Sequence, residues 1–205
     1  MTKAMRNPMI PSLGAGLRSL LFVVSLALLP ACQRDEVQNV TPQDMTAETL
    51  GHYCQMNLLE HPGPKAQVFL EGNPAPLFFS QVRDAIAYMR GPEQMAPIVA
   101  VYVNDMGAEG ATWDRPGDGN WFAVDKVVYV VGSTRMGGMG APETVPFSSR
   151  EKAEAFALAD GGRLLTLAEI TDNMVLAPVE TEPEQDGFDA DFQSRLRALP
   201  NQAGG

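Results

Sequence analysis

The chain has 205 residues, and its 25 acidic side chains outnumber its 15 basic ones, which gives a net charge of −10. A chain this acidic repels nucleic acid phosphates and anionic lipid headgroups. The composition therefore excludes a nucleic-acid-binding protein and favours cations, metal ions or basic protein surfaces as partners.

Residues 1–31 have the pattern of a signal peptide that is removed on export. A basic region is followed by an apolar run of about ten residues, 20–29, and by a small residue before Cys32. The run is too short to span a bilayer, which takes about 20 apolar residues. Cleavage before Cys32 removes three basic and no acidic residues, so the net charge falls from −10 to −13. The remaining chain suits one domain or two very small ones.

The sequence Leu-Pro-Ala-Cys, residues 29–32, resembles the lipobox of bacterial lipoproteins, in which the cysteine thiol is diacylated. We predict that Cys32 carries a lipid and anchors the mature chain to a membrane by its N-terminus. The alternative is ordinary secretion, with Cys32 removed or left free. Residues 32–50 are polar and suit a spacer after the anchor, and Thr41-Pro42 predicts the start of a short helix.

Beyond residue 50, short apolar runs alternate with turn residues and predict five strands. They span residues 67–71, 76–79, 98–103, 127–132 and 163–167. A helix is predicted from Ser80, because this stretch places four apolar side chains on one face: Val82, Ala85, Ile86 and Met89.

A second helix is predicted from Ser148, which has Glu151 at capping-box spacing and Gly161-Gly162 as a C-terminal stop. The two helices lie in matching contexts, 68 positions apart. The matching pairs are Phe79 and Phe147, Ser80 and Ser148, Ala85 and Ala153, Ala87 and Ala155, and Tyr88 and Phe156.

The repeat predicts an α+β fold of two similar small β-β-α-β lobes, residues 51–110 and 111–176, after the lipoprotein signal and spacer. The acidic tail, residues 177–205, has too little apolar surface to offset its ordering entropy, so we predict that it is disordered.

The stretch GHYCQMNLLEHPGP, residues 51–64, contains both histidines and the one cysteine outside the leader. If it is extended, His52, Cys54 and Met56 project from one face. Thiolate and thioether are soft donors that suit Cu(I), whereas zinc rarely takes methionine. The pattern therefore favours a Cu(I) site, although a buried cysteine that only fills space is the simpler alternative.

A glycine-rich loop, RMGGMGAPE, contains Met136 and Met139, where neither is expected to be a regular strand or helix core residue. One explanation is metal ligation, and the other is a hydrophobic docking patch. A thiol enzyme would need Cys54, a base at His52 or His61 and an orienting carboxylate such as Asp105. His52 is too close to Cys54 in sequence for that role, and His61 suits a turn.

Four motifs, in this order and together with the lipobox, resemble the NosL family over about residues 41–176. They are HYCQMNLLEHPGPKAQVFL, FFSQVRDAIAYM, AVYVNDMG and YVVGSTRMGGMGAPETVPF. The resemblance implies a periplasmic copper lipoprotein of denitrifying bacteria. It further implies that the protein binds Cu(I), delivers it to nitrous oxide reductase and contacts the membrane maturation and transport complex encoded alongside. It also implies a fold of two similar β-β-α-β lobes.

The family's Cys-Gly-Met matches Cys54-Gln55-Met56, and its Gly-Gly-Met-Gly loop matches residues 137–140. Gln55 replaces a family glycine, which puts a positive φ at this position in doubt. We predict a lipid-anchored copper chaperone and not an enzyme, with Cys54 and Met139 as donors and Met56 or His52 completing a three-coordinate Cu(I) site. Two questions stay open: whether Met136 or His61 takes part, and whether the protein is instead an interaction module that transfers no metal.

Overall fold

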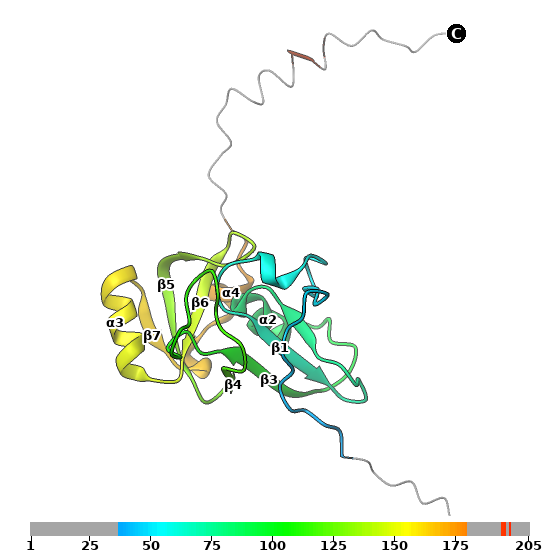
Figure 1. Ribbon diagram of the computed structural model, residues 1–205. Coiled ribbons are helices and arrows are strands. Elements are labelled where there is room, and N and C mark those ends of the chain that lie inside the picture. Colours follow the sequence, from blue (N-terminus) through cyan, green and yellow to red (C-terminus); the bar gives the residue numbers. More distant parts are fainter. Residues whose placement is uncertain (1–36, 180–193, 196, 198–205) are drawn as a thin grey trace, which may run out of the picture. The chain divides into compact units, whose positions relative to one another are not determined.

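The computed structural model describes residues 37–179 together with Ser194, Arg195 and Arg197, which are helical (Figure 1). The predicted signal peptide, its cleavage site and Cys32 lie outside the described residues, as does most of the predicted acidic tail. In the part of the chain that the structure describes, no helix is long and apolar enough to cross a membrane.

The fold is α+β, with two antiparallel sheets (Figure 1). The first sheet has the strand order β2-β1-β3-β4, and the second has the order β6-β5-β7. The first sheet consists of β1 (Ala66–Leu70), β2 (Leu77–Phe79), β3 (Ile98–Asn104) and β4 (Trp121–Ala123); the second consists of β5 (Val128–Met136), β6 (Pro142–Phe147) and β7 (Arg163–Leu165). In both sheets the earliest strand lies between the next two.

Each sheet is interrupted by one long helix between its second and third strands in chain order. These helices are α2 (Val82–Arg90) and α3 (Arg150–Asp160), and the shorter helices are α4 (Asp172–Leu176) and the 3₁₀ turns η1 (Leu58–Glu60) and η2 (Leu167–Glu169). The buried face of α2 is the predicted one: three of its apolar residues are fully buried and Met89 packs against the same core.

Helix α3 begins one residue later than the capping-box prediction requires. Its N-cap is Ser149, whose hydroxyl accepts a hydrogen bond from the Lys152 N–H at 3.3 Å. Ser148 is unavailable as a cap because its hydroxyl donates to Asp105 Oδ2 at 2.5 Å and its N–H donates to Oδ1 at 3.0 Å. The predicted stop is confirmed, since the helix ends at Gly161 with φ of 78°.

Two strands and one helix differ from the sequence prediction. Strand β4 has only three residues, too few to show a pattern, and β6 contains two prolines, which an edge strand tolerates because one side of it needs no ladder hydrogen bonds. The helix predicted after Thr41-Pro42 is wrong. That backbone is fixed instead by Gln67 of β1, whose side chain bonds both the N–H and the carbonyl of Gln43.

The two sheets share one hydrophobic core. Its buried members come from the first sheet and α2 and from the second half of the chain: Ala66, Val68, Leu70, Phe79, Val82, Ala85, Ile86, Tyr88, Val101, Val103, Val124, Val127, Tyr129, Ile170 and Val175. A smaller cluster, of Val130, Val145, Phe147 and Ala153, lies between the second sheet and α3. Because the larger core draws on both halves of the chain, segments far apart in sequence pack against each other.

Candidate metal centre

Residues 51–57 form a tight turn that is closed at its base by a bridge between Leu50 and Asn57. Gly51 donates its N–H to Met56 O at 3.0 Å, and Gln55 donates to Gly51 O at 2.9 Å. Gly51 also pairs with Phe78 of β2. The assumption that this stretch is extended, with His52, Cys54 and Met56 on one face, is therefore wrong: these bonds curl the backbone, so alternation along a strand does not apply.

Gln55 adopts a positive φ of 55°, the conformation that the family glycine would favour. A non-glycine residue in this region costs about 1–2 kcal/mol. The side chain offsets part of that cost, since Gln55 Nε2 donates to His52 O at 2.7 Å and to Gly51 O at 3.3 Å. The turn thus keeps its shape although the glycine is absent.

Cys54 is a free, partly buried cysteine at the centre of this turn. Its Sγ lies over the Cα of Gly51, where a Cβ would overlap with the sulfur. A weak contact of 3.9 Å joins Sγ to Met56 O. Glycine at position 51 therefore leaves the space that the thiol occupies.

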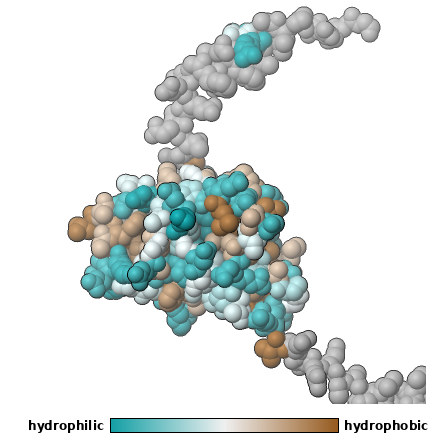
Figure 2. All heavy atoms as spheres, in the orientation of Figure 1, coloured by the Kyte–Doolittle hydropathy of each residue, from teal (hydrophilic) through white to brown (hydrophobic). Residues whose placement is uncertain are grey.

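The other two candidate donors of the turn have different surroundings. The His52 ring packs among three aromatic rings, with centroid distances of 5.3 Å to Tyr53, 5.5 Å to Phe79 and 5.5 Å to Tyr88. Met56, by contrast, is 42 % exposed. Figure 2 shows apolar side chains over this part of the chain, near η1, on a face that is otherwise mostly hydrophilic; exposed Leu50, Tyr53 and Leu59 belong to the same segment.

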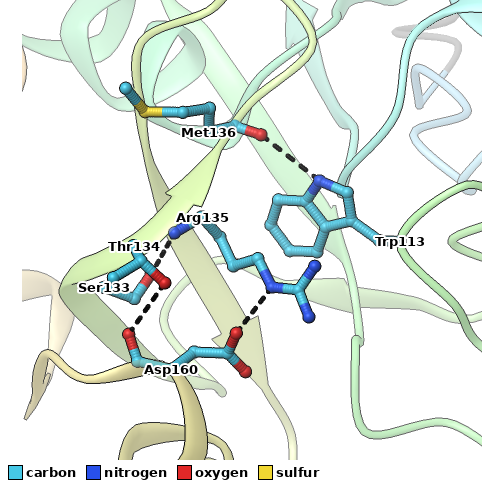
Figure 3. A network of polar contacts seen from close by, with 6 residues as sticks. All are labelled: Trp113, Ser133, Thr134, Arg135, Met136 and Asp160. Carbon is cyan, nitrogen blue, oxygen red and sulfur yellow. Dashed lines mark hydrogen bonds and ion pairs between the residues drawn. The ribbon is translucent and has the colours of Figure 1, made fainter.

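Met136 precedes the turn between β5 and β6, and Met139 lies in it. Met136 is expected from the sequence to lie in an irregular loop. In the structure Met136 is instead the last residue of β5. Trp113 Nε1–H donates to Met136 O at 3.3 Å, and Figure 3 shows the Met136 side chain pointing away from Trp113. Arg135 lies between Trp113 and Asp160. Its guanidinium lies over the Trp113 ring, and its Nε donates to Asp160 Oδ1 at 2.7 Å. Met139 follows in the loop and is 43 % exposed.

The Cys54 turn and the Met139 loop converge on Ser80, which precedes Gln81, the N-cap residue of α2. A Cβ placed on Gly51 would lie 3.9 Å from Ser80 Oγ, and a Cβ on Gly138 would lie 3.1 Å from Ser80 O. The structure therefore brings both sulfur-bearing segments into contact with one residue, although Cys54 and Met139 are far apart in sequence.

Residues 42–175 match the family model for NosL. The chain belongs to the NosL family. The copper-binding lipoprotein NosL of Achromobacter cycloclastes is 71 % identical over 189 residues, which cover 92 % of this chain and 98 % of that protein. The copper-binding lipoprotein NosL of Stutzerimonas stutzeri is 32 % identical over 160 residues, covering 77 % and 80 %.

A solved NosL structure has the same fold. The crystal structure of the copper chaperone NosL from Shewanella denitrificans superposes with a TM-score of 0.59 at 31 % identity, covering 64 % of this chain and 96 % of that one. The fold described above, with two antiparallel sheets, is thus NosL-like.

Two ionisable residues near the sulfur-bearing segments of this NosL chain, Lys65 and Glu143, are buried and each only 1 % exposed. Burial lowers the pKa of Lys65 to about 8, an effect that Glu143 and Cys54 partly oppose. Burial likewise raises the pKa of Glu143 to about 8. The backbone N–H groups of Arg83 and Thr144 donate to its Oε1 and partly oppose this rise. Lys65 Nζ donates to Pro62 O at 3.1 Å and to Gly63 O at 2.5 Å.

Asp105, the carboxylate considered as the orienting group of a thiol enzyme, makes its hydrogen bonds with other residues. Asp105 is buried and accepts hydrogen bonds from Gly107 and Ser148, so it is held at the start of α3. Among the described residues, no group of three or more His, Cys, Asp or Glu side chains is placed to hold a metal ion.

Sequence reasoning missed Gln81, Lys65 and Glu143, which bind the backbone around these segments. None of them is a soft donor of the kind that Cu(I) prefers, and Glu143 lies in β6, one of the two strands that were not predicted. The one available signal was the position of Gln81 within the NosL motif FFSQVRDAIAYM.

Proposed function

We propose that this chain is a copper chaperone that binds Cu(I) and delivers it to nitrous oxide reductase while the copper sites of that enzyme are assembled, in particular its tetranuclear copper-sulfide site. The observation that carries the proposal is the convergence of the Cys54 turn and the Met139 loop on Ser80. Relatives named as copper-binding lipoproteins and as a copper chaperone support it. The reductase as recipient follows from the family resemblance.

The proposed donors are the Cys54 thiolate and the Met139 thioether, with Met56 or His52 as the third. Thiolate and thioether are soft ligands that select Cu(I). Met56 is the better candidate for the third position, because the His52 ring is held among aromatic side chains whereas Met56 is exposed. The cargo leaves by ligand exchange, since a three-coordinate ion accepts a ligand from the recipient before it loses one of its own.

The proposed setting is the periplasm, with the mature chain anchored to a membrane through a lipid on Cys32. The acidic chain is expected to meet a basic face on its partners, which are the reductase apoprotein and the membrane maturation and transport complex. Exposed Leu50, Met56 and Leu59 around the thiol would add an apolar contact to that meeting.

For the fold, we propose that residues 51–110 and 111–176 are two copies of one β-β-α-β lobe. The matching strand orders β2-β1-β3 and β6-β5-β7 support a duplication, as does the 68-residue offset that relates α2 to α3. Strand β4 extends the first sheet although its residues follow position 110.

The decisive experiment is an anaerobic competition titration of the full-length chain against a chromophoric Cu(I) chelator. Cys54→Ser should abolish tight binding, because a hydroxyl is a hard and weak donor for Cu(I). An unchanged affinity in Cys54→Ser would refute the proposed site. Copper K-edge X-ray absorption of the wild-type complex then counts sulfur against nitrogen ligands and separates Met56 from His52.

Two further outcomes separate the other functions. An interaction module without metal transfer would still support reductase maturation with Cys54→Ser and Met139→Leu combined, whereas the chaperone would not. A thiol enzyme would turn over a thiol-reactive substrate and lose that turnover when copper is bound.

A further inference from the structure

Side chains from three separate segments hold the backbone of the Met139 loop. Trp113 Nε1 donates to the carbonyl of Met136 at 3.3 Å, and His61 Nδ1 bonds to that of Gly138 at 2.9 Å. Gln81 then accepts from two amides, those of Met139 at 3.0 Å and Ala141 at 3.3 Å. Three alternate peptide groups of the loop, 136–137, 138–139 and 140–141, are thus bound by side chains outside it.

The loop also closes on itself around the Gln81 side chain. Gly137 donates its N–H to Ala141 O at 2.8 Å, and Gly140 donates to Gly137 O at 2.9 Å. A Cβ on Gly137 would lie 2.5 Å from Gln81 Oε1 and 2.6 Å from Glu143 Oε2, so only glycine allows the backbone to approach these oxygens. The loop is therefore shaped around the carboxamide oxygen of Gln81.

Gln81 is itself rigidly placed. It is the N-cap residue of α2, its side chain makes no capping bond to that helix, and it is only 2 % exposed. Its Nε2 donates to Asp84 Oδ2 at 2.8 Å, which turns the oxygen towards the loop. Strand β6, which follows the loop, also contacts this helix: Glu143 of β6 accepts a hydrogen bond from the Arg83 N–H in the first turn of α2.

We propose that Gln81 is a positioning residue of the copper site: its side-chain oxygen fixes the peptide group of Met139, so that the thioether is held in place before copper arrives. This inference rests on the proposed function, because it takes Met139 as a Cu(I) donor. Residues that orient ligands through hydrogen bonds typically contribute about 10- to 100-fold to metal affinity.

The test is Gln81→Leu in the full-length chain, which removes the acceptor and adds no new metal donor. We expect the Cu(I) dissociation constant in the chelator competition to rise about 10- to 100-fold. The copper X-ray absorption spectrum at less than one equivalent should also show fewer sulfur ligands than in wild type. A change in fold stability alone would not alter that ligand count.

Gln94→Leu is the matched control. Gln94 Nε2 makes two side-chain hydrogen bonds of its own, to Tyr88 O at 2.6 Å and Gly91 O at 2.9 Å, at the opposite end of α2. This variant should bind Cu(I) as wild type does. Equal affinity and equal sulfur count in Gln81→Leu and Gln94→Leu would overturn the proposal.

A measurement on the wild-type chain does not depend on the folding of any variant. Without copper, the amide hydrogens of Met139 and Ala141 should exchange more slowly than those of an unstructured chain. Exchange at the unstructured rate would overturn the proposal. If Met139→Leu leaves Cu(I) binding unchanged, the donor assignment and this inference fail together; if Met139→Leu weakens binding and Gln81→Leu does not, only the positioning role is wrong.

Discussion

The imidazole of His61 donates a hydrogen bond from Nδ1 to the carbonyl oxygen of Gly138 at 2.9 Å, across 77 positions of sequence. A carbonyl only accepts, so Nδ1 carries the proton. The same contact explains why residue 138 is glycine: a Cβ there would lie 2.6 Å from the His61 Cβ and 3.1 Å from Ser80 O. His61, expected at the sequence level to be a turn residue, also fixes the loop that contains Met139.

Gly138→Ala should therefore displace the loop. Forcing an extra methyl group into a packed site typically costs about 1–3 kcal/mol, and we expect the free energy of unfolding in urea to fall by about that amount. Gly91→Ala is the matched control, because its φ is −71° and its Cβ would meet its nearest atom at 3.5 Å, an ordinary contact. Equal stabilities of the two variants would contradict this packing.

The two methionines beside the β5–β6 turn should differ in copper binding. Met139→Leu removes the proposed thioether donor, so we expect clearly weaker Cu(I) binding in the chelator competition. Met136→Leu is the control: its side chain is similarly exposed, at 51 %, and points away from Trp113 (Figure 3). A larger loss for Met136→Leu than for Met139→Leu would reverse the assignment of the loop donor.

The positive φ of Gln55 predicts an order of stability for two substitutions. Gln55→Gly and Gln55→Ala both lose the side-chain bonds to His52 O and Gly51 O. Alanine keeps the strain of the left-handed conformation, which costs about 1–2 kcal/mol. Glycine avoids that strain but loses more backbone entropy on folding, which costs roughly 0.5–1 kcal/mol. The glycine variant should therefore have the higher free energy of unfolding in urea, and the opposite order would mean that the turn does not hold φ near 55°.

Glu143 should make the stability of the chain depend on pH. Its pKa rises from an ordinary 4.5 to about 8 in the folded chain, mainly through burial. Between these two pKa values the folded state holds a proton that the unfolded state has lost. The stabilisation that this proton difference gives is complete below pH 4.5, and it falls by up to about 1.4 kcal/mol per pH unit as the pH rises to about 8.

Glu143→Gln removes this titration and keeps an oxygen for the Arg83 and Thr144 N–H groups. Relative to wild type, the variant should therefore gain stability as the pH rises from 4.5 to about 8. Urea unfolding across this range measures the difference. Lys65 acts in a separate window: burial lowers its pKa from 10.5 to about 8, so its contribution grows with pH above 8. Parallel curves for wild type and Glu143→Gln would show that Glu143 is ionised in the folded chain.

Much of the fold was predictable because it follows from local patterns. The five apolar runs and the buried face of α2 depend on side-chain periodicity, and the structure has strands and a helix at these positions. Strand β6 was missed because its two prolines favour the prediction of a loop. They are tolerated only because β6 lies at a sheet edge. The cap of α3 was misplaced by one residue because a distant carboxylate, Asp105, binds Ser148.

The candidate site divides in the same way. Residue type alone pointed to the soft donors proposed for Cu(I), namely Cys54, Met56 and Met139, and the sequence motifs carried the NosL resemblance. Tertiary contacts set three other features: residues 51–57 curl instead of extending, their turn meets the Met139 loop at Ser80, and Gln81 and His61 hold that loop. These features rest on hydrogen bonds and close contacts between segments distant in the chain, which leave no periodicity in the sequence.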